Sequence, residues 1–264
     1  MIIVGELINS SRKVIAEAIG AQDAETIQKV ASDQFIAGAD YIDVNAGTFA
    51  EKETQYLTWL TETVQSSIEA PCALDSPDPK ALEAALKVHK GTAMINSISL
   101  EKKRFDSLLP LIAGADVKVV ALCMSDEGMP ETVDDRMRIA EKIVNSLTAK
   151  NVALENIFLD PLVQPLSVDG TFGMKFINSI EKIVTTWPGI HTMCGLSNIS
   201  YGLPGRKFLN RTFMVMAITK GLDGAIINPL DQKMKAAIIA AEALAGRDNY
   251  CMNFLKAFRA GELE

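Results

Sequence analysis

The sequence predicts a single-domain α/β protein of the (β/α)8 TIM-barrel class. Short apolar or β-branched runs alternate with longer segments whose apolar residues recur at helical spacing. Eight such units fit into 264 residues, close to the roughly 250 residues that these barrels use. The glycine-rich loops GxGxxG and GxxxxGK[ST], which favour an open nucleotide-binding sheet, do not occur in the sequence.

Each predicted strand is a short apolar run, and each is followed by an amphipathic helical segment. The strands are expected at residues 2–7, 41–46, 72–75, 92–96, 117–124, 157–160, 192–197 and 224–228. The helical segments are expected at residues 14–37, 51–68, 79–89, 101–114, 132–149, 171–185, 206–220 and 231–245. One further helix is expected at residues 250–258, so that the barrel domain covers residues 1–264.

The composition favours small-molecule chemistry in the cytoplasm. No run approaches the 18 or so consecutive apolar residues of a membrane span, and the first residues lack the cationic region of a secretory signal. The net charge is −7 without a cluster of Lys and Arg, which argues against nucleic-acid binding. Four widely spaced cysteines and two histidines offer neither a disulfide framework nor a metal site.

Carboxylates and amides gather where the predicted strands end, which is where TIM barrels build their active sites. These residues are Glu6, Asn9, Asp43, Asn45, Asp75, Asn96, Asp160, Asn198 and Asn228. Each one alone is typical of an Asx turn or a helix N-cap. Together they form a rim rich in hydrogen-bond acceptors and poor in cations, which suits a ligand edge that carries N–H donors.

Other chemistries find less support in the sequence. Asp75 and Asp160 are candidates for the acid and base of a glycosidase, but aromatic residues, which line sugar sites, make up only 6% of the chain. Cys123 and Cys194 have no histidine at a short spacing that would activate them as nucleophiles.

Seven segments carry a resemblance to a known family: VGELIN (4–9), DVNAG (43–47), LDSPDPKALEAAL (74–86), MINSIS (94–99), LDPLVQP (159–165), GLSNIS (195–200) and NRTFMVMA (210–217). In order and spacing they resemble the methyltetrahydrofolate:corrinoid protein methyltransferases. That family has the pterin-binding barrel of the folate module of cobalamin-dependent methionine synthase, and it is more distantly similar to dihydropteroate synthase.

This resemblance implies methyl transfer, in either direction, between 5-methyltetrahydrofolate and the cobalt of a separate corrinoid protein. It implies that Asp75, Asn96 and Asp160 hold the pterin and that Asn198 donates a hydrogen bond to the reacting nitrogen. Further substrate contacts are implied for Gly195, Ser197, Arg206 and Ile226, and supporting roles for Glu6, Asn9, Asp43 and Asn45. The folate is a substrate, the corrinoid stays on the partner, no cofactor or metal is held permanently, and a homodimer is expected.

The residues themselves agree with a pterin ligand. The pyrimidine edge of a reduced pterin presents a ring N–H beside an exocyclic amine, and a carboxylate can accept both hydrogen bonds at once. An analogue without these donors would leave the carboxylate buried and unpaired, so an aspartate at this position would discriminate strongly.

Three positions depart from the family pattern, and two alternatives stay open. Leu7 replaces an arginine, Tyr201 a glutamine in some relatives, and Asn228 an expected aspartate. One alternative is a dihydropteroate synthase-like enzyme, which the basic stretch GRKF (205–208) favours and the loop AGTFAEKE (46–53), without arginine or proline, opposes. The other is a folate-binding module without catalysis of its own.

Overall fold

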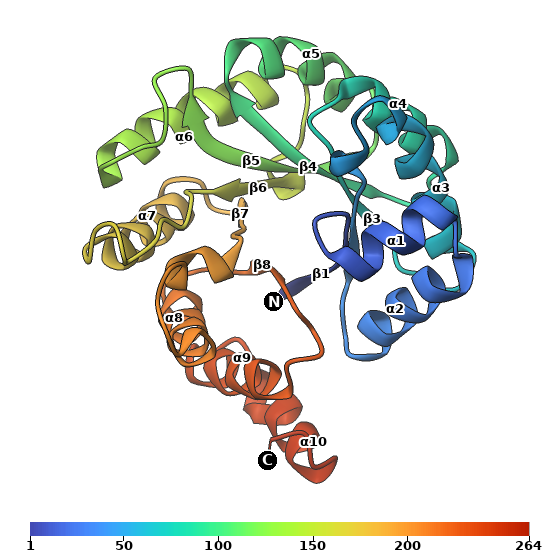
Figure 1. Ribbon diagram of the computed structural model, residues 1–264. Coiled ribbons are helices and arrows are strands. Elements are labelled where there is room, and N and C mark those ends of the chain that lie inside the picture. The colour runs from blue at the N-terminus through green and yellow to red at the C-terminus, as the bar shows by residue number, and fades with distance from the viewer. Residues whose placement is uncertain (264) are drawn as a thin grey trace.

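The computed structural model describes residues 1–263 and confirms the predicted (β/α)8 barrel (Figure 1). All eight strands are parallel and follow one another in chain order around the sheet, and β1 pairs with β8. Between β7 and β8 the ring is closed by a single bridge from Gly195 to Ile226, where Ile226 N donates to Cys194 O at 2.9 Å. Within the described residues no helix is both long and apolar enough to cross a membrane.

The strands match the predicted runs closely, with one exception. They are β1 Ile2–Asn9, β2 Tyr41–Asn45, β3 Cys72–Asp75, β4 Ala93–Leu100, β5 Val117–Ser125, β6 Ile157–Asp160, β7 His191–Thr192 and β8 Gly224–Ile227. The seventh strand was predicted over residues 192–197 but ends at Thr192, and Leu196–Ser200 instead form a 3-10 helix, η3. The tight turn suits the short polar side chains of Ser197 and Asn198, and it still buries Leu196.

Within residues 1–263, ten α-helices surround the barrel or extend from it: α1 Lys13–Ala21, α2 Ala24–Ile36, α3 Glu53–Gln65, α4 Pro79–Val88, α5 Lys102–Ala113, α6 Val133–Thr148, α7 Phe172–Thr186, α8 Arg206–Thr219, α9 Gln232–Leu244 and α10 Met252–Arg259. The segment predicted as one helix over residues 14–37 is two. Gln22 takes a left-handed conformation with φ 51°, and Asp23 then caps α2 by accepting a hydrogen bond from Thr26 N at 3.1 Å. Short 3-10 helices lie at Gly47–Lys52 (η1), Leu154–Asn156 (η2) and Asn249–Cys251 (η4).

The barrel interior is apolar along its middle and polar at the carboxyl ends of the strands. One buried cluster fills the middle: Val4, Tyr41, Ala73, Met94, Val120, Phe158 and Met193. Side chains on a strand alternate between its two faces, so the residue two positions further on also points inward. On five strands that residue is polar: Glu6, Asp43, Asp75, Asn96 and Asp160. The strand alternation therefore places an acidic layer directly above the apolar core.

Candidate active site

The acidic layer brings most of the predicted strand-end residues together. In the strand register Asn45 is paired with Asp75, and Asp75 is paired with Asn96. In the sequence these residues stand at separate strand ends, and the parallel register makes them direct neighbours on three adjacent strands.

Asp43 is the most deeply buried carboxyl group of the acidic layer, with a relative exposure of 3%. Its Oδ1 accepts a hydrogen bond from Asn96 Nδ2 at 3.1 Å. Burial, followed by repulsion from the nearby Asp75 carboxylate, raises the pKa of Asp43 well above its usual range. The side chain therefore orients Asn96 while resisting ionisation.

Asp75 lies at the end of β3 and is fixed by its neighbour on β2. Asn45 Nδ2 donates to Asp75 Oδ2 at 2.9 Å, while Asn45 Oδ1 accepts from Ser10 Oγ at 2.9 Å and from Gly47 N at 3.0 Å. Burial raises the pKa of Asp75, and the hydrogen bond from Asn45 together with the charge of Arg104 offsets part of that rise. Asn45 is thus committed to holding Asp75 and the following turn.

Asp160 closes the layer on the opposite side, at the end of β6. Its relative exposure is 6%, and its Oδ1 accepts a hydrogen bond from Leu162 N at 2.8 Å. Burial raises the pKa of Asp160 to about 7, although the backbone N–H groups of Leu162 and Gly195 and the charge of Arg136 act in the opposite direction. This carboxyl group changes its charge within the physiological range.

The two predicted residues on β1 have different surroundings. Burial raises the pKa of Glu6, opposed by the charges of Arg12, whose Nη2 lies 3.4 Å from Glu6 Oε1, and of Arg206. Asn9 Oδ1 accepts from Ser11 N at 3.0 Å and from Ser11 Oγ at 2.7 Å. Glu6 belongs to the acidic layer, whereas Asn9 forms the Asx turn that is typical of such positions.

The 3-10 helix η3 carries Asn198 at the mouth of the barrel. The Asn198 side chain is exposed and makes no hydrogen bond to any other residue in 1–263, while its backbone N–H donates to Gly195 O at 3.3 Å. Arg206 holds this turn, because its Nη2 donates to Ser197 O at 2.9 Å and its Nε donates to Ser200 Oγ at 3.1 Å. The amide of Asn198 is therefore free to meet a ligand from a fixed turn.

Ile226 and Gly195 form the wall next to η3. Ile226 is partly buried at the edge of the inner apolar cluster, and the bridge between these two residues joins the ends of β7 and β8. A Cβ atom added at Gly195 would lie 3.4 Å from Asn198 Nδ2, so a side chain at this position would press against the exposed amide.

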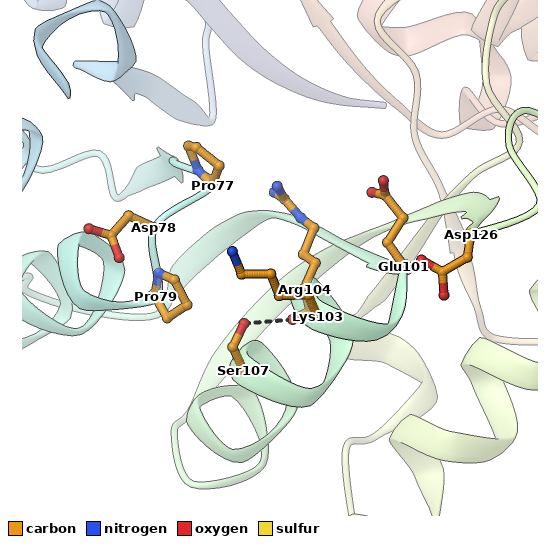
Figure 2. Close-up of a pocket in the computed structure, with 8 residues that line it drawn as sticks. All are labelled: Pro77, Asp78, Pro79, Glu101, Lys103, Arg104, Ser107 and Asp126. Carbon is orange, nitrogen blue, oxygen red and sulfur yellow. Dashed lines mark hydrogen bonds between the residues drawn. The ribbon is translucent and has the colours of Figure 1, made fainter.

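Two arginines near the site were not predicted from the sequence. Arg104, on α5, donates to Ser97 O through Nε at 2.9 Å and through Nη2 at 2.6 Å. Arg104 lines a cavity of about 600 Å³ between the loops after β3, β4 and β5, and Figure 2 shows its side chain among the other lining residues. Arg136, on α6, lies fully buried behind Asp160. Both lie on helices and not at the ends of strands.

The arrangement is suited to a neutral or cationic edge with several N–H donors. Burial raises the pKa of four inward-facing carboxyl groups, Glu6, Asp43, Asp75 and Asp160. Hydrogen bonds from a ligand would stabilise their ionised forms and offset the cost of burying them together. Among the described residues no group of three or more His, Cys, Asp or Glu side chains has the geometry of a metal site.

Comparison with known proteins gives consistent results. The family model "Pterin binding enzyme" matches residues 5–228. A methylcorrinoid:tetrahydrofolate methyltransferase of Eubacterium limosum is 39% identical over 265 residues, which cover 100% of this chain and 98% of that protein. The methionine synthase of Mycobacterium tuberculosis is 29% identical over 241 residues; the match covers 86% of this chain and 20% of that protein.

Solved structures share the fold at low sequence identity. A dihydropteroate synthase of Coxiella burnetii in complex with pteroic acid aligns with a TM-score of 0.71 and 13% identity, covering 92% of this chain and 93% of the other. A Yersinia pestis dihydropteroate synthase with a pterine-sulfa conjugate aligns with a TM-score of 0.69 and 13% identity, covering 93% of each chain. These likenesses concern the fold alone.

Proposed function

The chain belongs to the pterin binding enzyme family, and from this membership we propose that it transfers a methyl group between tetrahydrofolate and the corrinoid of a separate protein. The membership confirms the resemblance seen in the seven sequence segments. The full-length match to a methylcorrinoid:tetrahydrofolate methyltransferase favours transfer from the methylated corrinoid to tetrahydrofolate. The observation that carries the proposal is the acidic layer of Asp43, Asp75 and Asp160, in which burial raises the pKa of each carboxyl group and to which a pterin edge would bring further N–H donors.

The pterin is held by Asp75, Asn96 and Asp160 in this proposal. A carboxylate accepts two parallel N–H groups in the same way as it accepts a guanidinium fork, and Asn96 can donate and accept at a mixed edge. Asp43 and Asn45 then act as supports, because each is hydrogen-bonded to one of these residues. Gly195 and Ile226 provide a close wall, and Ser197 and Arg206 fix the turn beside it.

Asn198 is assigned to the reacting nitrogen N5 of the folate. The reaction joins the methyl carbon to N5 and breaks its bond to cobalt; the electron pair of that bond remains on cobalt, and the N5 proton passes to solvent. In the reverse direction, from 5-methyltetrahydrofolate to cobalt, the electron pair of the breaking carbon–nitrogen bond passes to N5, so negative charge builds on N5 relative to the bound methylated folate. Both directions share this transition state. A hydrogen bond from the free Asn198 amide at that moment stabilises the transition state more than the ground state.

The partner and the setting complete the proposal. Asn198 is exposed at the open end of the barrel, so a corrinoid protein would dock transiently over that end, with the folate beneath it. The acidic chain, with a net charge of −7, would favour a partner face of complementary charge. We place the enzyme in the cytoplasm as a homodimer that holds no permanent cofactor.

The test is a transfer assay with the purified full chain, methylcobalamin or a methylated corrinoid protein, and tetrahydrofolate, without aminobenzoate. We expect 5-methyltetrahydrofolate and demethylated corrinoid in equal amounts. Binding of tetrahydrofolate without transfer to or from either corrinoid would contradict the proposal in favour of a folate-binding module. Pteroate formed from a pterin pyrophosphate and aminobenzoate would support a dihydropteroate synthase-like enzyme instead.

A further inference from the structure

We propose that Arg136, on the outer helix α6, is a positioning residue that holds Asp160 in the conformation that binds the pterin. The inference rests on the proposed function, since it assigns a residue to the same pocket. Arg136 lies outside the barrel wall and is not expected to touch the substrate.

The first observation is the burial of a charge among neutral partners. Arg136 has a relative exposure of 0%. Its Nε donates to Pro161 O at 2.7 Å, its Nη1 to Thr132 O at 3.1 Å and its Nη2 to Gln164 Oε1 at 2.7 Å. All three acceptors are neutral oxygens. A buried charge is costly, and an apolar side chain of similar volume often serves stability as well or better.

The second observation is where those hydrogen bonds lead. Two of the three acceptors, on Pro161 and Gln164, belong to the loop that directly follows Asp160. Between them Leu162 has φ 65°, a left-handed conformation that a branched side chain rarely adopts. Leu162 N donates to Asp160 Oδ1 at 2.8 Å. Arg136 therefore fixes the loop on both sides of Leu162, and Leu162 in turn orients the Asp160 carboxylate.

The third observation concerns the charges that face Asp160 from each neighbouring element. Cys123 on β5 and Cys194 after β7 lie close, and burial raises the pKa of both thiols, so both remain neutral. The backbone N–H groups of Leu162 and Gly195 and the guanidinium of Arg136 favour the ionised carboxyl group. Among these groups Arg136 is the cation, so it also supports the form of Asp160 that accepts N–H donors from a ligand.

Two substitutions separate positioning from simple stability. Arg136→Met removes both the charge and the hydrogen bonds, and Arg136→Lys keeps the charge but cannot reach three separated acceptors. Arg138→Met is the matched control, because Arg138 lies on the same helix, is exposed and pairs with Glu127 at 2.9 Å. The dissociation constant of tetrahydrofolate is measured by calorimetry from pH 6 to 9, together with the thermal midpoint of each protein.

Wild-type enzyme should bind more tightly as the pH rises through about 7, where Asp160 ionises. We expect Arg136→Met to weaken binding at least about tenfold and to move this midpoint upward by about one pH unit. Arg136→Lys should weaken binding several-fold while leaving the midpoint in place, and it decides the question if the methionine variant does not fold. Arg138→Met should match wild type in both quantities.

The outcomes are distinguishable. If Arg136→Lys and the folded Arg136→Met lower only the thermal midpoint and bind tetrahydrofolate with the wild-type constant and pH midpoint, Arg136 is structural and the inference is wrong. If wild-type protein itself does not bind tetrahydrofolate, the proposed function is wrong and the inference is wrong with it. This outcome differs from the first because it is seen in the wild-type protein and not only in the variants.

Discussion

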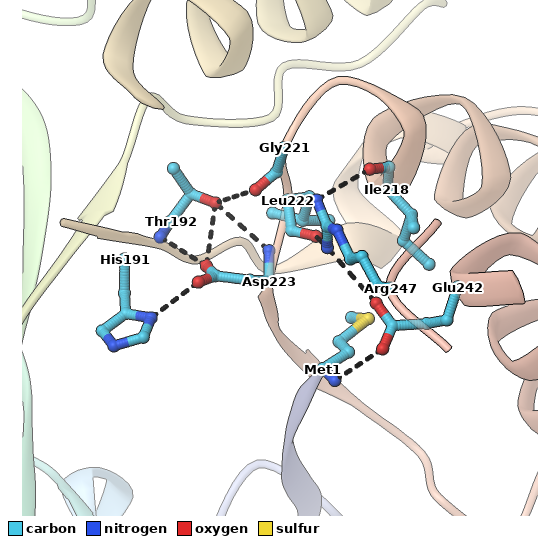
Figure 3. Close-up of polar contacts among 9 residues, drawn as sticks. All are labelled: Met1, His191, Thr192, Ile218, Gly221, Leu222, Asp223, Glu242 and Arg247. Atoms are coloured by element: carbon cyan, nitrogen blue, oxygen red, sulfur yellow. Dashed lines mark hydrogen bonds and ion pairs between the residues drawn. The ribbon is translucent and has the colours of Figure 1, made fainter. Parts of the chain in front are cut away.

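The carboxylates at the two ends of the barrel differ in the partners that the chain provides for them. At the amino-terminal end, shown in Figure 3, Asp223 accepts from His191 Nδ1 at 2.6 Å and from Thr192 N at 2.7 Å, and Glu242 pairs with the Met1 amine at 2.9 Å and with Arg247 at 3.2 Å. At the carboxyl end Asp43 and Asp75 accept side-chain hydrogen bonds from Asn96 and Asn45 but form no ion pair within residues 1–263, and the Asp75 carboxylate adds to burial in raising the pKa of Asp43.

The difference indicates which end is complete without a ligand. Donors within the chain satisfy the amino-terminal carboxylates, so that end contributes to stability. The carboxyl end places several buried acceptors close together. This arrangement lowers the stability of the fold, as is common at binding sites. Matched substitutions at the two ends should therefore change different measured quantities.

The largest effect is expected for Asp75→Asn. The substitution keeps the volume but replaces an ionised acceptor with a neutral amide, whose N–H group would oppose the donors of the pterin. Losing two charge-assisted hydrogen bonds should cost roughly 4 kcal/mol, or on the order of 10³-fold in tetrahydrofolate affinity. Calorimetric titration measures the affinity, and the thermal midpoint should not fall. An affinity within a factor of about three of wild type would remove Asp75 from the pocket.

The next effect is expected for Asn198→Ala. Because the Asn198 amide makes no other hydrogen bond in residues 1–263, its removal should leave the fold and the folate affinity nearly unchanged. The loss of one donor to the transition state should lower the single-turnover rate of methyl transfer about 10²-fold. Stopped-flow observation of the corrinoid spectrum measures that rate. A normal rate would contradict the role assigned to Asn198.

Periodicity predicted most of the fold correctly, and the failures have local causes. Seven strand runs were located to within a few residues, because buried parallel strands are apolar and are followed by turn residues. The seventh was extended to Ser197 because Cys194 and Leu196 resemble a continuing strand, although Leu196 is buried by a 3-10 turn. The break at Gln22 was missed because no glycine or proline marks it.

The acidic layer of the candidate site could be predicted from the sequence because it lies on the strands. Asp43, Asp75, Asn96 and Asp160 follow from the strand alternation, since each stands two positions after an inward-facing core residue. Which of these residues lie side by side depends on the strand register, and the register cannot be read from the sequence. Arg136 reaches Asp160 from a helix 24 positions earlier in the chain, through hydrogen bonds to backbone and amide oxygens that no motif encodes.

A smaller effect, on stability and not on affinity, is expected for Asp223→Asn at the amino-terminal end. The amide keeps one acceptor but loses the charge that His191 Nδ1 and Thr192 N contact. The free energy of unfolding should fall by about 2 kcal/mol, as for other hydrogen bonds to a charged group. Urea denaturation measures this fall, and tetrahydrofolate affinity should remain that of wild type. A weakened affinity with unchanged stability would reverse the contrast between the two ends.

The smallest effect, Asp43→Asn, should make the protein more stable. The pKa of Asp43 is raised in the folded state, so its contribution to stability is complete below the unfolded value of about 3.8 and is lost as the pH rises toward the folded value. Asparagine does not titrate, and its Oδ1 can still accept from Asn96 Nδ2. Removing the buried acid should therefore raise the free energy of unfolding by about 1 kcal/mol at pH 8 and by less at pH 5. Urea denaturation at both pH values measures the two differences, and an equal or lower stability at pH 8 would show that the carboxyl end is not held under electrostatic strain.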